Sequence, residues 1–177
     1  NACLTAATLD LPINQNLGFA YIIPYKDYKK NITVAQFQMG YKGFIQLAMR
    51  SGQFKTINVT DVKEGEISSR NLLTGEIVFT WIEDMETRSK AKTIGYVSYF
   101  KLLNGFEKLL YMTTEESRFH GNKYSKSFKS GFGLWKDDFD AMAKKTVIKL
   151  LLSKFAPMTV EMQKAILADQ AVIDADA

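Results

Sequence analysis

The segment from Gly133 to Phe155, GLWKDDFDAMAKKTVIKLLLSKF, constrains the fold more than any other part of the chain. Its apolar residues recur at helical spacing and, at about 100° per residue, they cover more than half of the circumference. A helix with such a wide apolar surface has to pack against other elements on several sides. The sequence therefore predicts one long, largely buried helix that organises the rest of the chain.

Lysines interrupt this helix, and their angular positions divide them into two groups. Lys145 and Lys149 share a narrow polar stripe one turn apart, which we expect to be open, whereas Lys144 and Lys154 fall on the apolar arc. Like charges at this spacing repel each other by about 0.2–0.5 kcal/mol, so the stripe favours a nearby anion. That anion is either a carboxylate of the protein itself or a phosphate group, and the helix alone leaves both open.

Positive charge is concentrated in one block of the sequence. Residues 1–87 hold 8 Lys/Arg and 9 Asp/Glu, residues 88–154 hold 14 and 6, and residues 155–177 hold 1 and 4. The net charge of +4 for the whole chain conceals this asymmetry. A basic block favours a polyanionic partner, although a solvated basic face gives the same pattern.

The first quarter of the chain predicts a helix, a hairpin and a second helix. Residues 2–9 are typical of the end of a helix, and the runs 18–25 and 33–39 predict two strands joined by a polar turn. Residues 41–52 carry apolar side chains at i, i+3, i+4, i+7 and i+8, which predicts an amphipathic helix with Gly52 as its C-terminal cap.

The middle of the chain predicts an antiparallel meander of three to five strands. The runs 54–62 and 76–83 alternate and are rich in β-branched residues. The runs 93–103 and 106–113 flank Asn104-Gly105, a strong hairpin signal. A further helix is expected after Pro157. Because the strands are grouped and helices surround them, the sequence predicts an α+β fold with an antiparallel sheet backed by helices.

Residues 115–133 are polar, contain glycine, and predict a basic loop before the long helix. Aromatic residues alternate with the cations here, a combination suited to nucleic acid, because lysines neutralise phosphates and rings stack on bases. Ordinary packing beneath a loop explains the aromatic residues equally well. The loop contains Arg118, Lys123, Lys126, Lys129, Phe119, Tyr124, Phe128 and Phe132.

Side chains for catalysis or metal binding are sparse. His120 is the only histidine and Cys3 the only cysteine, so no two-histidine metal site and no internal disulfide can form. No phosphate-binding loop for ATP is present. Asp61-Val62-Lys63 matches the acid-x-Lys element of metal-dependent nucleases, with Glu76 as a possible second acid, but such a tripeptide is common by chance. We therefore expect no catalytic residue, metal or cofactor.

Two further features concern where the protein resides. No run of 18 apolar residues occurs, so no membrane span is expected. The single cysteine favours a reducing, intracellular setting. Because the chain opens on Asn1, we expect it to be a fragment of a longer protein.

Three separated blocks of the sequence resemble one known family. FAYIIPY, then AQFQMGYKGFIQLAMRSG, then the run WKDDFDAMAKKTVIK are similar, in this order, to the RecT recombinases of phages and prophages, and more distantly to Red beta of phage lambda. The resemblance extends from about Leu11 to Pro157. It implies a core of hairpin and antiparallel sheet backed by a helix, with residues 1–157 forming the DNA-binding, annealing and oligomerisation core and residues 158–177 a C-terminal helical segment.

The resemblance also implies a function. Members of this family anneal complementary DNA strands without ATP, coat single-stranded DNA that a partner 5′–3′ exonuclease releases, and form rings and helical filaments in the bacterial cytoplasm. It implies as partners single-stranded DNA, the duplex annealing intermediate and other copies of the same chain, and no membrane.

The family pattern carries DNA contact onto named positions. Lys145 matches the lysine of the W…M-x-x-K-T run, and Lys144 and Lys149 are its neighbours on the same helix. The Y-K-G block suggests Lys42, and its R-S-G end suggests Arg50. Further candidates for the groove are Lys90, Lys92, Lys126, Lys129, Phe128 and Trp135.

Two other functions fit the same residues. One is a passive single-stranded nucleic-acid-binding module that does not accelerate annealing. The other is a metal-dependent nuclease that uses Asp61 and Glu76.

Overall fold

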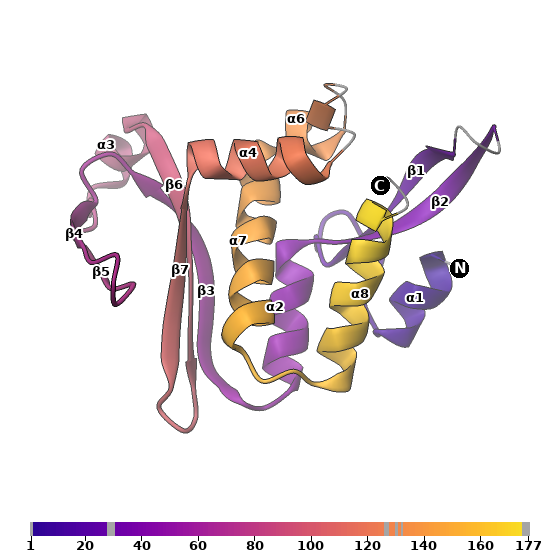
Figure 1. Cartoon of the computed structure of the whole chain (residues 1–177), viewed down its shortest axis with the longest axis horizontal. Coiled ribbons are helices and arrows are strands. Elements are labelled where there is room, and N and C mark those ends of the chain that lie inside the picture. The colour runs from indigo at the N-terminus through magenta and orange to yellow at the C-terminus, as the bar shows by residue number, and fades with distance from the viewer. Residues whose placement is uncertain (1, 28–30, 126–127, 130, 132, 175–177) are drawn as a thin grey trace.

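The protein is an α+β structure in which helices cover one side of a small antiparallel sheet (Figure 1). The structure is a computed structural model that describes residues 2–27, 31–125, 128–129, 131 and 133–174; for residues 27 and 170–174 it describes the backbone only. In chain order the elements are α1 (Ala2–Thr8), β1 (Ala20–Asp27), β2 (Ile32–Met39), α2 (Tyr41–Arg50), β3 (Phe54–Lys63), β4 (Ile67–Arg70), β5 (Ile77–Phe79), α3 (Met85–Lys90), β6 (Thr93–Leu102), β7 (Glu107–Thr113), α4 (Thr114–Tyr124), α6 (Leu134–Asp137), α7 (Phe139–Phe155) and α8 (Val160–Asp174).

The main core lies between the sheet and α7. Strands β3, β6 and β7 pair antiparallel with β6 in the centre. Because side chains alternate along a strand, Tyr96, Phe100 and Leu102 of β6 face the helices and are buried. On α7, Val147, Ile148 and other apolar residues are fully buried, as the sequence predicted for this helix.

Helices α2 and α8 complete this core on the far side of α7. Phe44 and Leu47 of α2 are buried, as are Met162 and Ala165 of α8. Figure 1 shows α7, α2 and α8 running side by side, with α1 beyond them. The predicted helix at 41–52 is confirmed; Gly52 follows its end with a φ of +66°, the left-handed backbone conformation expected of a C-terminal glycine.

Two ribbons flank this body. The predicted hairpin at 18–39 forms β1 and β2, which extend away from the helices in Figure 1. The second ribbon, β4 and β5, covers the opposite face of the sheet over a smaller apolar cluster around Val62, Val97 and Tyr111. The predicted strand at 76–83 is thus shorter than expected and pairs with β4, an element that the sequence analysis missed, rather than joining the meander.

The prediction of a loop over residues 115–133 is wrong for its first half. Residues 114–124 form α4, which lies across the end of the sheet in Figure 1. The helix begins with a capping box, because the Thr113 hydroxyl accepts from the Glu116 N–H at 3.0 Å and the Glu116 carboxylate accepts from the Thr113 N–H at 2.8 Å. The Thr113-x-x-Glu116 spacing was the available signal, but the polar composition of the segment outweighed it. Helix α3 was missed in the same way, although Asp84 caps it.

The predicted helix at 133–155 consists of two pieces. Residues 134–137 form the single turn α6, and α7 begins at Phe139. Asp138 has a non-helical backbone, with φ −146° and ψ 76°, and its carboxylate accepts from the Ala141 N–H at 3.0 Å. The break exists because an aspartate satisfies free N–H groups at a helix start better than it continues a helix. Among the described helices none is both long and apolar enough to cross a membrane.

Candidate nucleic-acid interface

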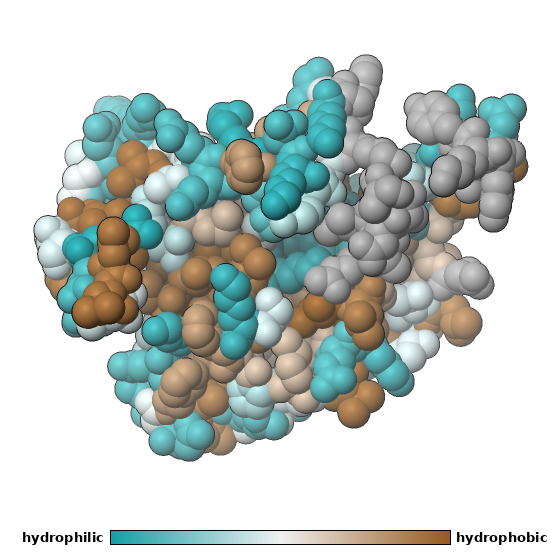
Figure 2. Space-filling view, in the orientation of Figure 1, coloured by the Kyte–Doolittle hydropathy of each residue, from teal (hydrophilic) through white to brown (hydrophobic). Residues whose placement is uncertain are grey.

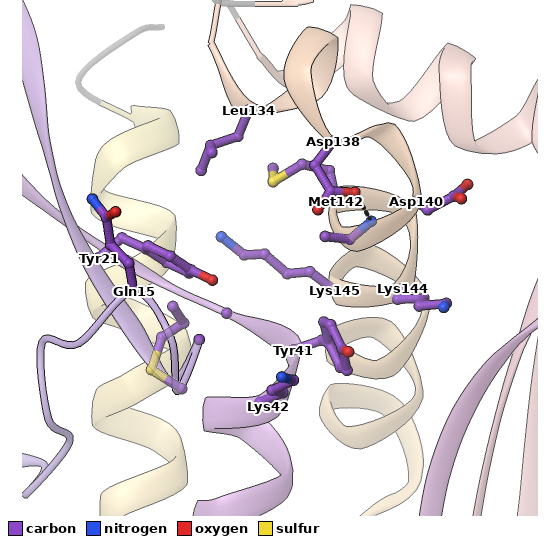
Figure 3. A pocket seen from close by; sticks show the side chains of 14 residues that line it. Gln15, Tyr21, Tyr41, Lys42, Leu134, Asp138, Asp140, Met142, Lys144 and Lys145 are labelled. Atoms are coloured by element: carbon purple, nitrogen blue, oxygen red, sulfur yellow. Dashed lines mark hydrogen bonds between the residues drawn. The ribbon is translucent and has the colours of Figure 1, made fainter.

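A cavity of about 240 Å³ lies where the base of β1, the start of α2 and the start of α7 meet. Figure 3 shows Tyr21 and Lys145 pointing toward one another across it, with Lys42 and Tyr41 along one side. Its wall contains side chains from segments that are more than 100 residues apart in the sequence. The lining residues are Gln15, Gly18, Tyr21, Met39, Gly40, Tyr41, Lys42, Leu134, Asp138, Asp140, Ala141, Met142, Lys144 and Lys145.

Two glycines, Gly40 and Gly43, allow the backbone segments beside this cavity to approach each other closely. A Cβ atom at Gly40 would lie 2.1 Å from the carbonyl oxygen of Gly18, and one at Gly43 would lie 2.2 Å from the carbonyl oxygen of Phe19. The Gly40 N–H donates to that same Phe19 carbonyl at 3.0 Å. The Gly-Tyr-Lys-Gly sequence therefore holds the loop before β1 against the first turn of α2.

The start of α2 contributes positive potential to the cavity. No side chain caps this helix, because the N-cap residue is Gly40. The N–H groups of a first turn carry about half a positive charge. Lys42 lies in that turn, is exposed, and has no ion-pair partner among the described residues. This is the combination of groups that binds phosphate oxygens.

The two acidic residues of the cavity already have donors. Asp138 caps α7, and Asp140 accepts a hydrogen bond from the Tyr96 hydroxyl. Burial and the Asp140 carboxylate raise the pKa of Tyr96 beyond the range in which it ionises in cells. The pKa of Tyr21 is also raised, first by burial and then by Asp138. Both tyrosines therefore stay neutral and keep a hydroxyl donor.

Lys144 of α7 lines the edge of the cavity, and its side chain also reaches toward the sheet. Its Nζ atom is 3.7 Å from an Asp61 Oδ atom, a loose contact. Asp61 also contacts Lys63 at 3.1 Å and Arg88 at 3.7 Å. Burial favours the neutral acid here, but the hydrogen bond from Lys63 and the charges of Lys144 and Lys63 outweigh it and lower the pKa of Asp61. Asp61, the acid of the predicted nuclease element, is thus surrounded by cations, while Glu76 lies in the turn of the β4–β5 ribbon.

Lys145 and Lys149 share a buried counter-ion. The Lys145 Nζ donates to Asp169 Oδ1 at 2.7 Å and the Lys149 Nζ to Oδ2 at 2.7 Å. The Met39 N–H also donates to Oδ1, at 3.1 Å. The sequence left open whether the anion beside this stripe is a carboxylate of the protein or a phosphate group. In the folded chain it is a carboxylate of the protein, that of Asp169 in α8.

The expectation that this stripe is open is therefore wrong. Lys145 is 7% exposed and Asp169 3%, because α8 packs over the stripe. Burial alone would raise the pKa of Asp169, but the two ammonium groups outweigh it and hold that pKa below its usual range. Asp169 was missed by the sequence analysis because it lies 20 residues beyond Lys149, in a helix whose placement was unknown. Whether the two lysines also contact DNA stays a prediction.

The structure spreads the other predicted cations over the surface. Arg50, at the far end of α2 from Lys42, donates to the carbonyl oxygens of Leu9 at 2.9 Å and Asp10 at 2.7 Å, and so caps the end of α1. Lys90 pairs with Glu86 at 2.6 Å on α3, and Lys92 is exposed beyond that helix. Lys129 is exposed, and Lys126 lies outside the described residues.

Phe128 and Trp135, the two aromatic residues predicted to contact DNA, pack against each other in the structure. Trp135 is 6% exposed and packs edge-on against Phe128, with ring centroids 5.5 Å apart, and against Phe139 at the same distance. Gly121 of α4 gives these rings room, since a Cβ there would lie 2.9 Å from Phe128. Packing, the alternative stated for these aromatic residues, is what the structure describes at Trp135.

The sequence analysis did not anticipate Gln15, Tyr21 or Tyr41 as lining residues. Tyrosines in the two Gly-containing blocks were the available signal, but composition does not reveal that these blocks meet. Only the pairing of β1 with β2 and the turn at Gly40 bring Tyr21 beside Tyr41.

Comparison with known proteins agrees with this arrangement. The model of the RecT family matches residues 1–177. The chain belongs to the RecT family. It is 49% identical over 169 residues to "Uncharacterized protein YqaK" of Bacillus subtilis (strain 168), and 29% identical over 175 residues to "Protein RecT" of Escherichia coli (strain K12). Each alignment covers 96% of this RecT-family chain, but 55% and 61% of those two proteins, so the chain spans little more than half of their length.

Proposed function

We propose that the chain binds single-stranded DNA and anneals complementary strands without ATP, as part of phage homologous recombination. Membership of the RecT family supports a recombination role. The observation that carries the proposal is the cavity at the start of α2, where an uncapped helix end, a lysine without an ion pair in the described part of the chain, and two tyrosines adjoin.

In this proposal Lys42 and Lys144 hold successive phosphates along the mouth of the cavity. In Figure 3, Tyr41 lies between them. Among the described residues Lys42 forms no ion pair, and the 3.7 Å contact of Lys144 with Asp61 is long enough to be exchanged for a phosphate. Tyr21 and Tyr41 offer ring faces and neutral hydroxyls to the sugar or base, contacts that do not depend on sequence.

The remaining predicted cations extend the path. Lys145 forms the inner wall of the cavity, and it and Lys149 reach DNA only if a phosphate replaces Asp169. The proposed DNA contacts lie in residues 1–157, whereas the segment 158–177 contains α8, the helix that closes the core. Arg50, Lys90, Lys92, Lys126, Lys129, Phe128 and Trp135 stay candidates for contacts elsewhere on the path.

Annealing requires no bond chemistry in this scheme. The protein holds the backbone and leaves the bases open, and a second strand is retained only when its bases pair and stack. Base pairing and contacts between copies in a ring or helical filament drive the reaction, so no cofactor is needed. The partners are single-stranded DNA, the duplex intermediate and a phage 5′–3′ exonuclease, in the cytoplasm of a bacterial host cell.

The experiment is annealing of complementary oligonucleotides without ATP, comparing the wild type with Lys42→Ala/Lys144→Ala. Each phosphate contact contributes about 0.7 to the slope of log K against log salt for single strands. Loss of two contacts should lower the slope by about 1.4 and slow annealing in proportion. Lys164→Ala on α8 is the control, because this lysine is exposed and lies outside the cavity.

Each alternative has its own signature in this assay. Protection of single strands without faster duplex formation identifies a passive binding module. Cleavage that needs a divalent metal and is lost in Asp61→Ala identifies a nuclease. An unchanged salt slope in the double variant refutes the assignment of Lys42 and Lys144.

A further inference from the structure

The tip of the β4–β5 ribbon exposes two consecutive leucines. Leu72 is 81% exposed and Leu73 95% exposed, the two highest values among the large hydrophobic residues that the structure describes. Figure 2 shows this end of the molecule as a patch of hydrophobic residues. Apolar surface that gathers at a projecting tip is typical of a contact site rather than of an ordinary surface.

This tip has a fixed shape. The Asn71 side-chain oxygen accepts from the N–H groups of Leu73 at 3.0 Å and Thr74 at 3.3 Å, while its backbone pairs with Gly75 and Glu76 at 2.9 and 2.8 Å. Gly75 supplies the φ of +74° that the turn requires. Because the backbone is already ordered, little conformational entropy is lost when the leucines bind.

The base of the ribbon is equally well anchored. Glu66, which is fully buried, accepts from the Arg88 guanidinium at 2.7 and 3.2 Å and from the Lys63 and Ile82 N–H groups at 2.7 and 3.3 Å. The ribbon therefore presents its leucines as part of the rigid body, and they do not fold back onto the same chain.

A groove on the same molecule has complementary properties. It encloses about 600 Å³ between β7, α4 and α7, and Figure 2 shows hydrophobic residues gathered below α4 in this region. Leu110, Met112 and Leu150 form its floor, and Phe119, 69% exposed, forms part of its rim. Its size and apolar floor suit a pair of leucine side chains.

Charge also matches between the two sites. Glu64 precedes the ribbon, Glu76 lies in its turn and Glu83 follows it. All three are exposed, and none has an ion-pair partner among the described residues. Lys123 and Lys154 stand at the groove and likewise lack carboxylate partners there. Glu115 and Glu116 also line the groove, at the start of α4, so its positive charge comes from Lys123 and Lys154.

We propose that the leucine tip of one copy of the chain inserts into the β7–α4–α7 groove of the next copy. The two surfaces are different patches of one molecule, so the contact is head-to-tail. Such contacts generate rings or open helical assemblies, according to the rotation between copies. The inference gives the oligomer of the proposed function a specific interface, but it rests on the tip and the groove and not on DNA binding.

Cysteine crosslinking tests this contact without DNA. In a Cys3→Ser background, which removes the only native thiol, Leu73→Cys and Phe119→Cys are introduced together and the protein is oxidised. We expect a ladder of dimers, trimers and larger species. A mixture of the two single-cysteine proteins should stop at a mixed dimer. The control pairs Leu4→Cys on α1, also exposed, with Phe119→Cys; equal crosslinking by the control pair overturns the proposal.

Sedimentation velocity provides a second, independent measurement. Leu72→Asp/Leu73→Asp should weaken self-association at least about tenfold, because burial of each leucine contributes more than a factor of ten. Leu103→Asp, in the exposed β6–β7 turn, is the matched control and should associate like the wild type. Unchanged association of the double variant refutes the contact.

DNA binding separates the two proposals. Binding of a short oligonucleotide to the Leu72/Leu73 variant should match the wild type, since the cavity is intact, while annealing of long strands declines. If the wild type binds no DNA, the proposed function is refuted. The proposed contact between copies is then still decided by the crosslinking result, which does not involve DNA.

Discussion

Replacement of Asp169 by Asn is expected to destabilise the protein by about 3–5 kcal/mol. The carboxylate accepts three hydrogen bonds, from the Lys145 and Lys149 ammonium groups at 2.7 Å each and from the Met39 N–H at 3.1 Å. Removal of one partner from a buried ion pair costs about that much, because the remaining charge stays buried. We attribute the full cost of a buried, unpaired charge to Lys145 alone, since the Lys149 side chain is 13% exposed and able to turn toward water.

Urea unfolding followed by circular dichroism measures this cost. Lys145→Met is the companion variant: it leaves Asp169 paired with Lys149 and the Met39 N–H, so a smaller loss of about 1–3 kcal/mol is expected. A loss below about 1 kcal/mol for Asp169→Asn, or a larger loss for Lys145→Met than for Asp169→Asn, would refute the assignment of a buried three-charge cluster.

The same variant tests the prediction that Lys145 and Lys149 contact DNA. If phosphate competes with Asp169 for these lysines, Asp169→Asn should bind single-stranded DNA more tightly and with a steeper salt dependence. A salt slope equal to that of the wild type, measured where both proteins are folded, would leave the two lysines with a structural role alone.

Three further predictions concern the supports of the fold. Arg50→Met should cost about 1–3 kcal/mol and make α1 the first site of proteolysis, because the carbonyl oxygens of Leu9 and Asp10 lose their donor; equal proteolysis of both proteins would contradict this. Gly43→Ala should cost about 1–3 kcal/mol in thermal unfolding, because its Cβ would meet a carbonyl oxygen at 2.2 Å, whereas Gly65→Ala should show backbone strain alone. Burial raises the pKa of Glu66, but Arg88 and the N–H donors outweigh it, so the folded pKa lies below the unfolded one. The resulting stability is present above pH about 4.5 and is lost as the pH falls through the folded pKa, and Glu66→Gln should flatten that loss in acid unfolding curves.

Local patterns predicted the elements whose signals are short-range. The hairpin at Asn104-Gly105, the amphipathic helix at 41–52 and the apolar face of α7 all follow from residue spacing, and the structure confirms them. The α+β class follows from their order. Errors occurred where a polar composition concealed a helix, as in α4, or where one capping residue, Asp138, divided an apolar run.

The site depended on contacts that sequence spacing does not reveal. The angular analysis correctly placed Lys145 and Lys149 on one stripe, but the element that covers this stripe lies 20 residues further along the chain. Likewise, the meeting of Tyr21 and Lys42 depends on how a hairpin returns to the start of α2. A single sequence identifies which lysines act together, and only tertiary packing shows what they face.

The position of Asp169 near the end of the described chain limits how the protein is shortened for experiments. A version that stops before this residue would retain every apolar contact that Met162, Ala165 and Ile166 make with the core. It would nevertheless leave Lys145 and Lys149 without their carboxylate. Loss of DNA annealing in such a truncated protein would therefore report damage to the interior as readily as removal of a binding segment. Truncations with their end point beyond Asp169 avoid this confusion.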